Sequence, residues 1–263
     1  MIKVISAAIK HPRNRTLPDF QEYWATRHGP MFARTPHLRG YVQHITLLEA
    51  YDGDPRPTHD GASMFYYDDV DVLRSPPPSP KLGEAIKPED GDIYDWYVAS
   101  RRYGDPEVIT LAENTIADDR QLFDRESGWP THHKRTHVVA REHVIVDGPT
   151  APSMVKALFI ASRMPGLSLT EMSQHWLEVH GPLVSNVPGL RRYVQNHAVA
   201  EAYALGRSTH DGWAEMWFDD LPALRTARQS AEWKALQQDV GLFAQPMAIV
   251  VAREGVRKPP PSG

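Results

Sequence analysis

Short runs of apolar residues follow one another along this chain, and they occur in the same order twice. Residues 2–9 and 154–162 combine β-branched and small side chains, which predicts a strand at each place. A proline-containing turn follows each run. Apolar residues then recur four apart, as at Phe20 and Trp24, which is typical of the buried face of a helix. Both halves of the chain are therefore predicted to begin with a strand and a helix.

The repetition is also visible at the level of single residues. The pattern W-x-x-x-H-G-P occupies 24–30 and returns at 176–182, 152 positions later. At the same displacement, P-x-L-R-x-Y-V-Q occurs at 36–43 and at 188–195. Two copies that agree over so many positions indicate an internal duplication of a domain-sized unit.

The remaining pattern completes each unit. A strand is predicted over 38–45 and 190–197, a His-Asp-Gly turn at 59–61 and 210–212, and a third strand directly after that turn. Later parallels are the D-x-x-L-F pattern at 119–123 and 239–243 and closing strands at 138–142 and 247–254. In the second unit the stretch from 221 leads directly into a predicted helix over 231–243. Each unit thus has the order β-α-β-β-α-β, which predicts a ferredoxin-like α+β fold with helices on one face of an antiparallel sheet.

A sheet that is covered on one side needs a partner for its other side. We therefore expect the two units to pair their bare faces as a pseudo-dimeric α+β barrel that encloses a cavity between the sheets. The expected domains are 1–150, with an insertion at about 75–107 that opens on the proline-rich stretch 75–80, and 151–255. Residues 256–263 are expected to form a frayed, proline-rich tail.

Composition narrows the classes of function. The 263 residues carry a formal net charge of −4, which provides no basic field for nucleic acid. The absence of cysteine removes disulfides, thiolate nucleophiles and sulfur-ligated metals. We find no secretory leader and no membrane-spanning run, so a cytoplasmic protein is expected that contacts neither nucleic acid nor membrane. Whether two copies of the chain also associate as a homodimer is left open.

Nucleotide-binding and nucleophile-elbow motifs are also missing from the sequence. Histidines, carboxylates and tyrosines remain as catalytic groups, and thirteen histidines suit acid–base chemistry near neutral pH. His175 and His180 are five apart and fall on different helix faces, and His132, His133 and His137 lack a metal-binding context, so neither a metal nor another cofactor is expected.

Taken together, the W-x-x-x-H-G-P, P-x-L-R-x-Y-V-Q and D-x-x-L-F patterns resemble the EthD family. That family belongs to the wider dimeric α+β barrel group, which also includes muconolactone isomerases and small cofactor-free polyketide oxygenases and cyclases. The resemblance covers nearly all of both copies and implies the fold more specifically than the reaction. It also implies that His28 and His180 are the catalytic acid or base.

The candidate site residues follow from the repeat and from strand alternation. We expect Gly-Pro to end the helix in both copies, which places His28 and His180 at helix ends, where a structural role is an alternative. Side chains that alternate along a strand put Tyr41 with Gln43, and Tyr193 with Gln195 and His197, on one face, which either lines the cavity or is solvated. The candidate catalytic residues are His28, His180, Tyr41, Tyr193, His44 and His197. The candidate substrate-binding residues are Trp24, Trp176, Gln43, Gln195, His59, Asp60, His210 and Asp211.

Two of these groups have a competing structural interpretation. Trp24 and Trp176 are expected mainly in the core, and the two His-Asp-Gly segments fit a turn that uses Asp-Gly for its backbone geometry. The leading hypothesis is a cofactor-independent isomerase, dehydratase or lyase that acts on a small apolar or aromatic intermediate. The alternatives are a cofactor-free oxygenase of an electron-rich aromatic and a binding protein for a reactive intermediate.

Overall fold

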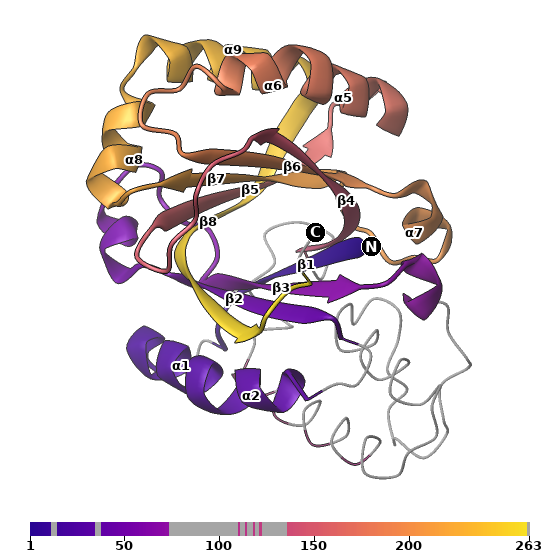
Figure 1. Cartoon of the computed structure of the whole chain (residues 1–263), viewed down its shortest axis with the longest axis vertical. Helices are drawn as coiled ribbons and strands as arrows, with labels where there is room; N and C mark the ends of the chain where they lie inside the picture. The colour runs from indigo at the N-terminus through magenta and orange to yellow at the C-terminus, as the bar shows by residue number, and fades with distance from the viewer. Residues whose placement is uncertain are drawn as a thin grey trace.

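A computed structural model describes residues 1–11, 15–34, 38–73 and 136–261, together with positions 110, 114, 118, 121 and 122. Eight antiparallel strands in these residues close into a barrel, with helices outside it on two opposite sides (Figure 1). The strands are β1 (Ile2–Ala8), β2 (Gly40–Thr46), β3 (Gly61–Tyr67), β4 (Thr136–Val146), β5 (Val155–Arg163), β6 (Arg192–Ala198), β7 (Gly212–Phe218) and β8 (Ala244–Lys258).

The first half of the chain contains α1 (Leu17–Tyr23), the π-helical turn η1 (Trp24–His28), α2 (Gly29–Phe32) and the short 3₁₀ turns η2 (Leu48–Asp52) and η3 (Val70–Leu73). The second half contains α5 (Leu169–His175), the π-helical turn η5 (Trp176–His180), α6 (Gly181–Val184), α7 (Ala200–Ala204), α8 (Leu221–Arg228) and α9 (Ala231–Phe243). Two of these elements pack on the other half: Ala202 of α7 joins the first-half core, and Ala50 of η2 joins the second-half core. Among the described residues, no helix has the length and apolarity needed to cross a bilayer.

The order of strands around the barrel is β1-β3-β2-β8-β5-β7-β6-β4. The four strands before residue 150 form one contiguous block of the barrel, the four after it form the other, and two seams join these blocks. At these seams β2 pairs with β8, and β4 pairs with β6. The last strand of each half therefore hydrogen-bonds to the other half.

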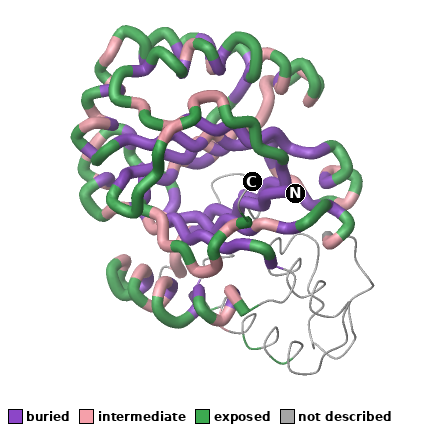
Figure 2. The backbone as a smooth tube through the Cα atoms, in the orientation of Figure 1, coloured by how far each residue is buried: buried purple, intermediate pink, exposed green. Residues whose placement is uncertain are grey.

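Both faces of the strands are covered, as Figure 2 shows by the burial of the barrel wall. All seven residues of β1 are buried, which explains why apolar residues there occur on both faces of the strand, with Lys3 and Ser6 as its buried polar positions. One face packs on the helices, and the other points into the barrel. Inside, apolar side chains from both halves form one core, which includes Ile5, Val138, Leu158, Trp213 and Val250.

Apolar packing narrows the space that the sequence predicted between the two sheets. Side chains fill the middle of the barrel, because inward-facing residues of β1, β4, β5 and β8 meet across it. At one end of the barrel a hollow of about 660 Å³ remains, and its lining from both halves includes Lys3, Glu142, Lys156 and Glu215. The predicted inter-sheet space is therefore found at that end, with charged groups in its walls.

The helix starts agree with their sequence signals. Ser168 and Glu171 form the capping box, with the Ser168 hydroxyl accepting from the Glu171 backbone N–H at 3.1 Å. The predicted helix ends are wrong, because Gly29 and Gly181 keep right-handed helical angles and the helix continues through Gly-Pro. A π-helical turn places each proline at the start of a new α-helical segment, where its missing N–H costs little.

Two further predictions concern the ends of the units. The tail expected from residue 256 starts later, since β8 continues to Lys258, which pairs with Tyr41 of β2. The insertion at about 75–107, His132 and His133 lie outside the described residues, as does most of the D-x-x-L-F pattern at 119–123.

Candidate functional site

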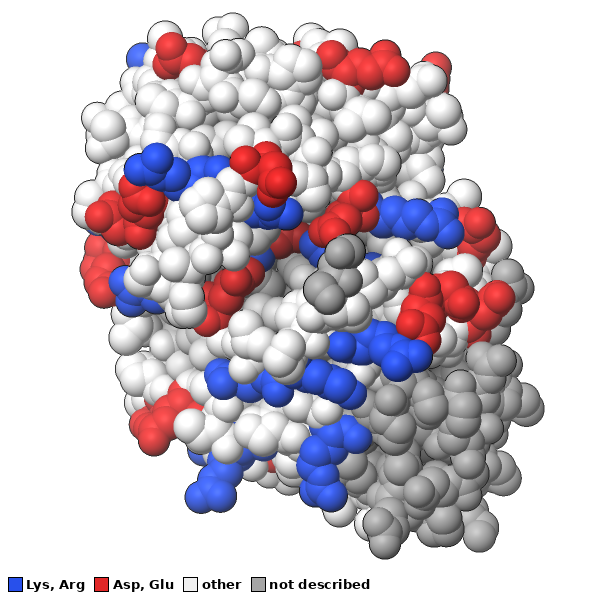
Figure 3. Space-filling view, viewed as in Figure 1, with Lys and Arg blue, Asp and Glu red and all other residues white. Residues whose placement is uncertain are grey.

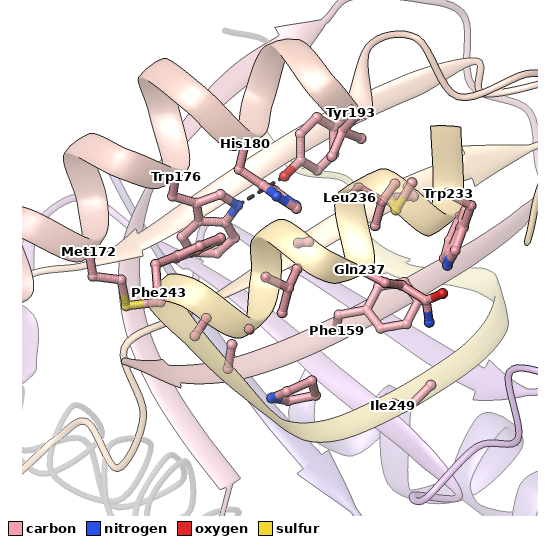
Figure 4. Close-up of a pocket in the computed structure, with 18 of the residues that line it drawn as sticks. Phe159, Met172, Trp176, His180, Tyr193, Trp233, Leu236, Gln237, Phe243 and Ile249 are labelled. Atoms are coloured by element: carbon pink, nitrogen blue, oxygen red, sulfur yellow. Dashed lines mark hydrogen bonds between the residues drawn. The ribbon is translucent and has the colours of Figure 1, made fainter. Parts of the chain in front are cut away.

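An apolar cavity of about 320 Å³ lies between the helices of the second half and the outer face of the barrel (Figure 4). Its floor comes from β5, β6, β7 and β8, and its roof from α5, η5, α6 and α9. The walls are mostly aromatic and aliphatic, and include Phe159, Met172, Trp176, Leu236, Phe243 and Ile249. This size is at the lower end for small-molecule pockets, which suits a ligand of one or two rings.

His180 is the ionisable imidazole in this wall. The π-helical turn η5 ends at it, its exposure is 5%, and its Nδ1 lies 2.8 Å from Asp239 Oδ2. A carboxylate accepts, so Nδ1 carries the proton and Nε2 is left as a base. Burial lowers the pKa of His180 below its ordinary value, and Asp239 opposes this only in part. This direction of the shift favours the neutral ring near pH 7.

Asp239 is held from both sides. Its other carboxylate oxygen, Oδ1, lies 2.9 Å from His175 Nε2, and the His175 side chain is 29% exposed. Asp239 comes from α9, one turn before the end of that helix. Two histidines from α5 and η5 thus fix one carboxylate, and this carboxylate fixes the tautomer and orientation of His180.

Tyr193 supplies a hydroxyl to the same cavity. Its oxygen accepts two hydrogen bonds, from Trp176 Nε1 at 2.9 Å and from Gln195 Nε2 at 3.2 Å. Because both donors point at the oxygen, the phenolic proton is directed away from them and is available to a ligand oxygen. Burial raises the pKa of Tyr193, so the hydroxyl stays protonated near neutral pH. Figure 4 shows His180 and Tyr193 at the same upper side of the pocket.

Gln195 and His197 support this arrangement from behind. Gln195 Nε2 also donates to the Trp176 carbonyl at 2.8 Å, the carbonyl that accepts the i+5 bond of the π-helical turn. Gln195 Oε1 lies 2.9 Å from His197 Nε2, and the His197 ring stacks on Trp176 at 4.7 Å. Burial lowers the pKa of His197 to about 3, with His143 nearby contributing. These residues position the cavity wall and do not line the cavity.

The first half repeats this framework. His28 Nδ1 lies 2.9 Å from Asp118 Oδ2, and Tyr23 donates to the other oxygen of Asp118 at 2.6 Å, in the place of His175. Gln43 Nε2 donates to the Trp24 carbonyl at 3.0 Å, as Gln195 does to Trp176. The repeated W-x-x-x-H-G-P and Y-V-Q patterns therefore encode a π-helical turn locked by a strand glutamine. The glycine is needed because a Cβ at Gly29 would come within 2.7 Å of Gln43 Oε1.

The first half fills the space that the second half leaves open. Phe32 packs against Tyr41 at 5.4 Å and against Phe65 at 4.8 Å between ring centroids. The Tyr41 hydroxyl is 3.2 Å from Ser63 Oγ. The corresponding residues of the second half are Val184 for Phe32, Met216 for Phe65 and Ala214 for Ser63. Smaller or more adaptable side chains thus open the cavity, and the loss of the serine frees the phenolic proton of Tyr193.

His44 faces the inside of the barrel, apart from this cavity. It belongs to a buried charged cluster in which the Lys156 ammonium is 3.1 Å from His44 Nε2 and 2.6 Å from Glu215, and forms an ion pair with Glu254. Burial and the Lys156 charge lower the pKa of His44. A hollow of about 660 Å³ opens beside the cluster, ringed by charges of both signs (Figure 3).

This cluster also contains a possible metal-ligand set. The ligand atoms of His44, Glu215 and Glu254 lie within 4.8 Å of one another. The Lys156 ammonium bonds to all three, so an internal cation already takes the central position. Lys3 adds a second ammonium, 3.2 Å from Glu215. The donor set as built suits an ion-pair network better than a metal.

The His-Asp-Gly segments serve the turns. Asp60 accepts from the Lys10 backbone at 2.8 Å, and Asp211 from the Arg163 backbone at 2.7 Å. His59 pairs with the neighbouring Thr58 hydroxyl, and His210 with Ser162. A Cβ at Gly61 or Gly212 would clash with the tryptophan ring above it. The assignment of His59, Asp60, His210 and Asp211 to substrate binding is therefore not supported by their geometry.

Of the fourteen predicted site residues, Trp176, His180 and Tyr193 line the cavity. The equivalents Trp24, His28 and Tyr41 lie buried in the packed first half, with Gln43 beneath them. The sequence prediction missed Asp239, Arg228 and Trp233. The D-x-x-L-F repeat was the available signal for Asp239, although its alignment points to Asp119, whereas Asp118 holds His28.

Known proteins resemble this chain in fold and, over part of its length, in sequence. No curated protein matches its sequence. A solved anthrone oxidase-like protein is similar with a TM-score of 0.54 and 11% identity, over 100% of this chain and 96% of that one. An ethyl tert-butyl ether d (ethd) family protein from Bacillus halodurans C-125 is 25% identical over 38% of this chain and 97% of that chain, with a TM-score of 0.32.

A heme-binding protein from Thermus thermophilus covers 96% of this chain and 90% of its own at 9% identity and a TM-score of 0.43. The TM-score of 0.54 supports the ferredoxin-like, dimeric α+β barrel type of fold. The EthD domain family matches residues 164–246, which hold His180, Tyr193 and Asp239. The second half of this chain is therefore similar to the EthD domain over residues 164–246.

Proposed function

We propose that the second half binds a small aromatic or alicyclic carbonyl compound and catalyses proton transfer at the carbon next to the carbonyl group. The observation that carries the proposal is the pairing of two groups in one apolar cavity. His180 presents an oriented, unprotonated Nε2, and Tyr193 presents a hydroxyl proton. A base for the C–H bond and a donor for the carbonyl oxygen are the two groups that enolisation requires.

The proposed cycle conserves protons. His180 Nε2 removes the proton from the α-carbon, and the electron pair of that C–H bond moves into the enolate while the Tyr193 hydroxyl donates a hydrogen bond to its oxygen. The Asp239 carboxylate stabilises the imidazolium that forms. His180 then returns the proton to another carbon, which gives an isomer. When a β-substituent departs instead, the proton on His180 goes to the leaving group or to water, which gives elimination.

We also infer that the barrel is an internal pseudo-dimer of two units, 1–150 and 151–255, in which the first has become a structural partner. Support comes from the strand order and from the repeated hydrogen bonds of Gln43 and Gln195. Phe32 and Phe65 fill the first-half counterpart of the cavity. The second unit then carries the active site alone.

The test is hydrogen–deuterium exchange at the α-carbon of 2-tetralone in D₂O, followed by NMR with the full chain. The wild type is expected to exchange faster than buffer, and His180→Ala to lower the enzymatic rate by about 10²–10⁴-fold. Tyr193→Phe is expected to lower it by about 10²–10³-fold, as for the loss of one oxyanion donor. His28→Ala is the matched control, and it should leave the exchange rate within about twofold of wild type once folding is checked by circular dichroism.

Equal losses for His28→Ala and His180→Ala would contradict the assignment to the second half. Saturable binding of 2-tetralone without exchange would instead indicate a carrier. Consumption of dioxygen in the same mixture would indicate a cofactor-free oxygenase that uses the same base.

A further inference from the structure

One end of the cavity carries polar groups that the chemistry of His180 and Tyr193 does not use. They come from the end of α8 and from α9: Arg228, Trp233 and Gln237 all line the cavity. Figure 4 places Trp233 and Gln237 at the right of the view, while Trp176 and Phe243 lie at the left. The cavity therefore has a second polar region, separated from the catalytic pair by apolar wall.

Trp233 provides a buried donor without an acceptor. Its side chain is 2% exposed, and within the described part of the chain its Nε1–H has no hydrogen-bond partner. In Figure 4 Trp233 stands beside the Gln237 side chain at the edge of the pocket. Since buried donors are almost always paired in folded proteins, a ligand oxygen at this end is the natural acceptor.

Arg228 provides the charge. Its Nε and Nη2 hold the two oxygens of Asp54 at 2.9 and 2.5 Å, and its guanidinium lies 5.0 Å above the Trp233 ring. The Arg228 side chain is 12% exposed, whereas that of Asp54 is 76% exposed. A largely enclosed cation is thus neutralised by a carboxylate that sits in solvent on a loop of the first half.

We propose that this end of the cavity binds a carboxylate, so that the ligand is an aromatic keto acid with its carbonyl oxygen at Tyr193 and its carboxylate at Arg228 and Trp233. The proposal rests on the proposed function for the carbonyl end only. Arg228 already holds one carboxylate in the planar, two-point geometry that guanidinium groups favour. A single cation that is already shared with the exposed Asp54 carboxylate matches a singly charged group better than a phosphate.

Asp54 sets the strength of this site. Its charge competes with the ligand for the same guanidinium, so its removal should strengthen the binding of an anion and leave a neutral ligand unaffected. The opposite change, removal of the guanidinium, should weaken only the anion. These paired effects separate recognition of charge from general effects on the cavity.

The experiment is isothermal titration of the full chain with 6-acetyl-2-naphthoate and with its neutral counterpart, 6-acetyl-2-naphthamide. For the carboxylate we expect Arg228→Gln to weaken binding by about 10–100-fold, Asp54→Asn to tighten it by about 3–10-fold, and Trp233→Phe to weaken it by about 3–10-fold. For the amide, Arg228→Gln and Asp54→Asn should change affinity by less than about twofold. Arg228→Lys keeps the positive charge and loses the planar two-point geometry of the guanidinium, so its affinity for the carboxylate should lie between those of the wild type and Arg228→Gln.

Similar affinities for the two probes in the wild type, or no binding of the carboxylate, would overturn the inference. So would an equal loss of both probes in Arg228→Gln. None of these results affects the exchange of 2-tetralone, which has no carboxylate, so failure here is distinguishable from failure of the proposed function.

Discussion

Val184→Phe tests whether cavity size decides which half binds a ligand. Val184 is 1% exposed, lines the cavity from α6, and stands where the first half has Phe32. The Phe32 ring packs 4.8 Å from Phe65, which shows the path that a new ring would follow. Filling part of a cavity of about 320 Å³ should stabilise the fold by about 0.5–2 kcal/mol. For a chain of this size, each kcal/mol corresponds to about 2–4 °C in Tm.

Ligand binding should change in the opposite direction. Forcing a ligand into the narrowed space is an overpacking cost of about 1–3 kcal/mol. This corresponds to roughly 5- to 150-fold weaker binding of 2-tetralone. Calorimetric scans and titration of the same sample measure both effects.

The control is Phe32→Val, which should destabilise the first half by about 2–4 kcal/mol through a new cavity and leave the affinity for 2-tetralone unchanged. A Val184→Phe variant that binds 2-tetralone as tightly as wild type would refute the assignment of the ligand to this cavity. Loss of stability on this substitution would show that the first-half packing does not carry over to the second half.

Four further predictions concern α9, the buried ion pairs and the proposed catalytic base. Gly241→Ala should raise the free energy of unfolding by about 0.5–1 kcal/mol, because a Cβ there meets nothing within 4 Å and glycine is unfavourable inside a helix. A lower free energy of unfolding for this variant, measured by urea denaturation, would contradict this. Lys156→Met should cost about 3–5 kcal/mol, because it leaves Glu215, 1% exposed, without its nearest cation; a neutral effect would show that Lys3 suffices. Ion pairing lowers the pKa of Glu254 to about 2 from 4.5, so its stabilising contribution should be complete above pH 4.5 and be lost as the pH falls toward 2; unfolding at about pH 7, 5 and 3 checks the sign. Because the pKa of His180 is lowered from 6.5, kcat/KM should be flat at neutral pH and decline only below pH 6.5; a decline that begins above about pH 7 would contradict a neutral base.

Several features of this protein were determined by local sequence. The strands over 2–9 and 154–162, the Ser168 capping box and the duplication itself follow from residues close together in the chain, because propensity, caps and periodicity act over one or two turns. The EthD resemblance was likewise readable from short patterns, and the family match confirms it for residues 164–246. His180 and Tyr193 were found because they belong to those patterns.

What the sequence could not supply were the contacts between distant segments. The helix continues through Gly29 and Gly181 because a glutamine from the next strand bonds to the π-helical turn, an interaction between residues 19 positions apart. Asp239 reaches His180 across 59 positions, and Arg228 meets Asp54 across 174. No periodicity within a segment encodes such pairs.

The position of the cavity also depends on tertiary packing. Strand alternation correctly put Tyr193, Gln195 and His197 on one face, yet it could not say whether that face looks into the barrel or toward the helices. The two sides are filled differently: Ile5, Leu158 and Val250 meet across the middle of the barrel and leave a charged hollow at one end, while Val184, Ala214 and Met216 leave an apolar space under the helices. The sequence thus determined the repeated elements and named the candidate residues His180 and Tyr193, whereas contacts between distant segments decided where the apolar cavity lies.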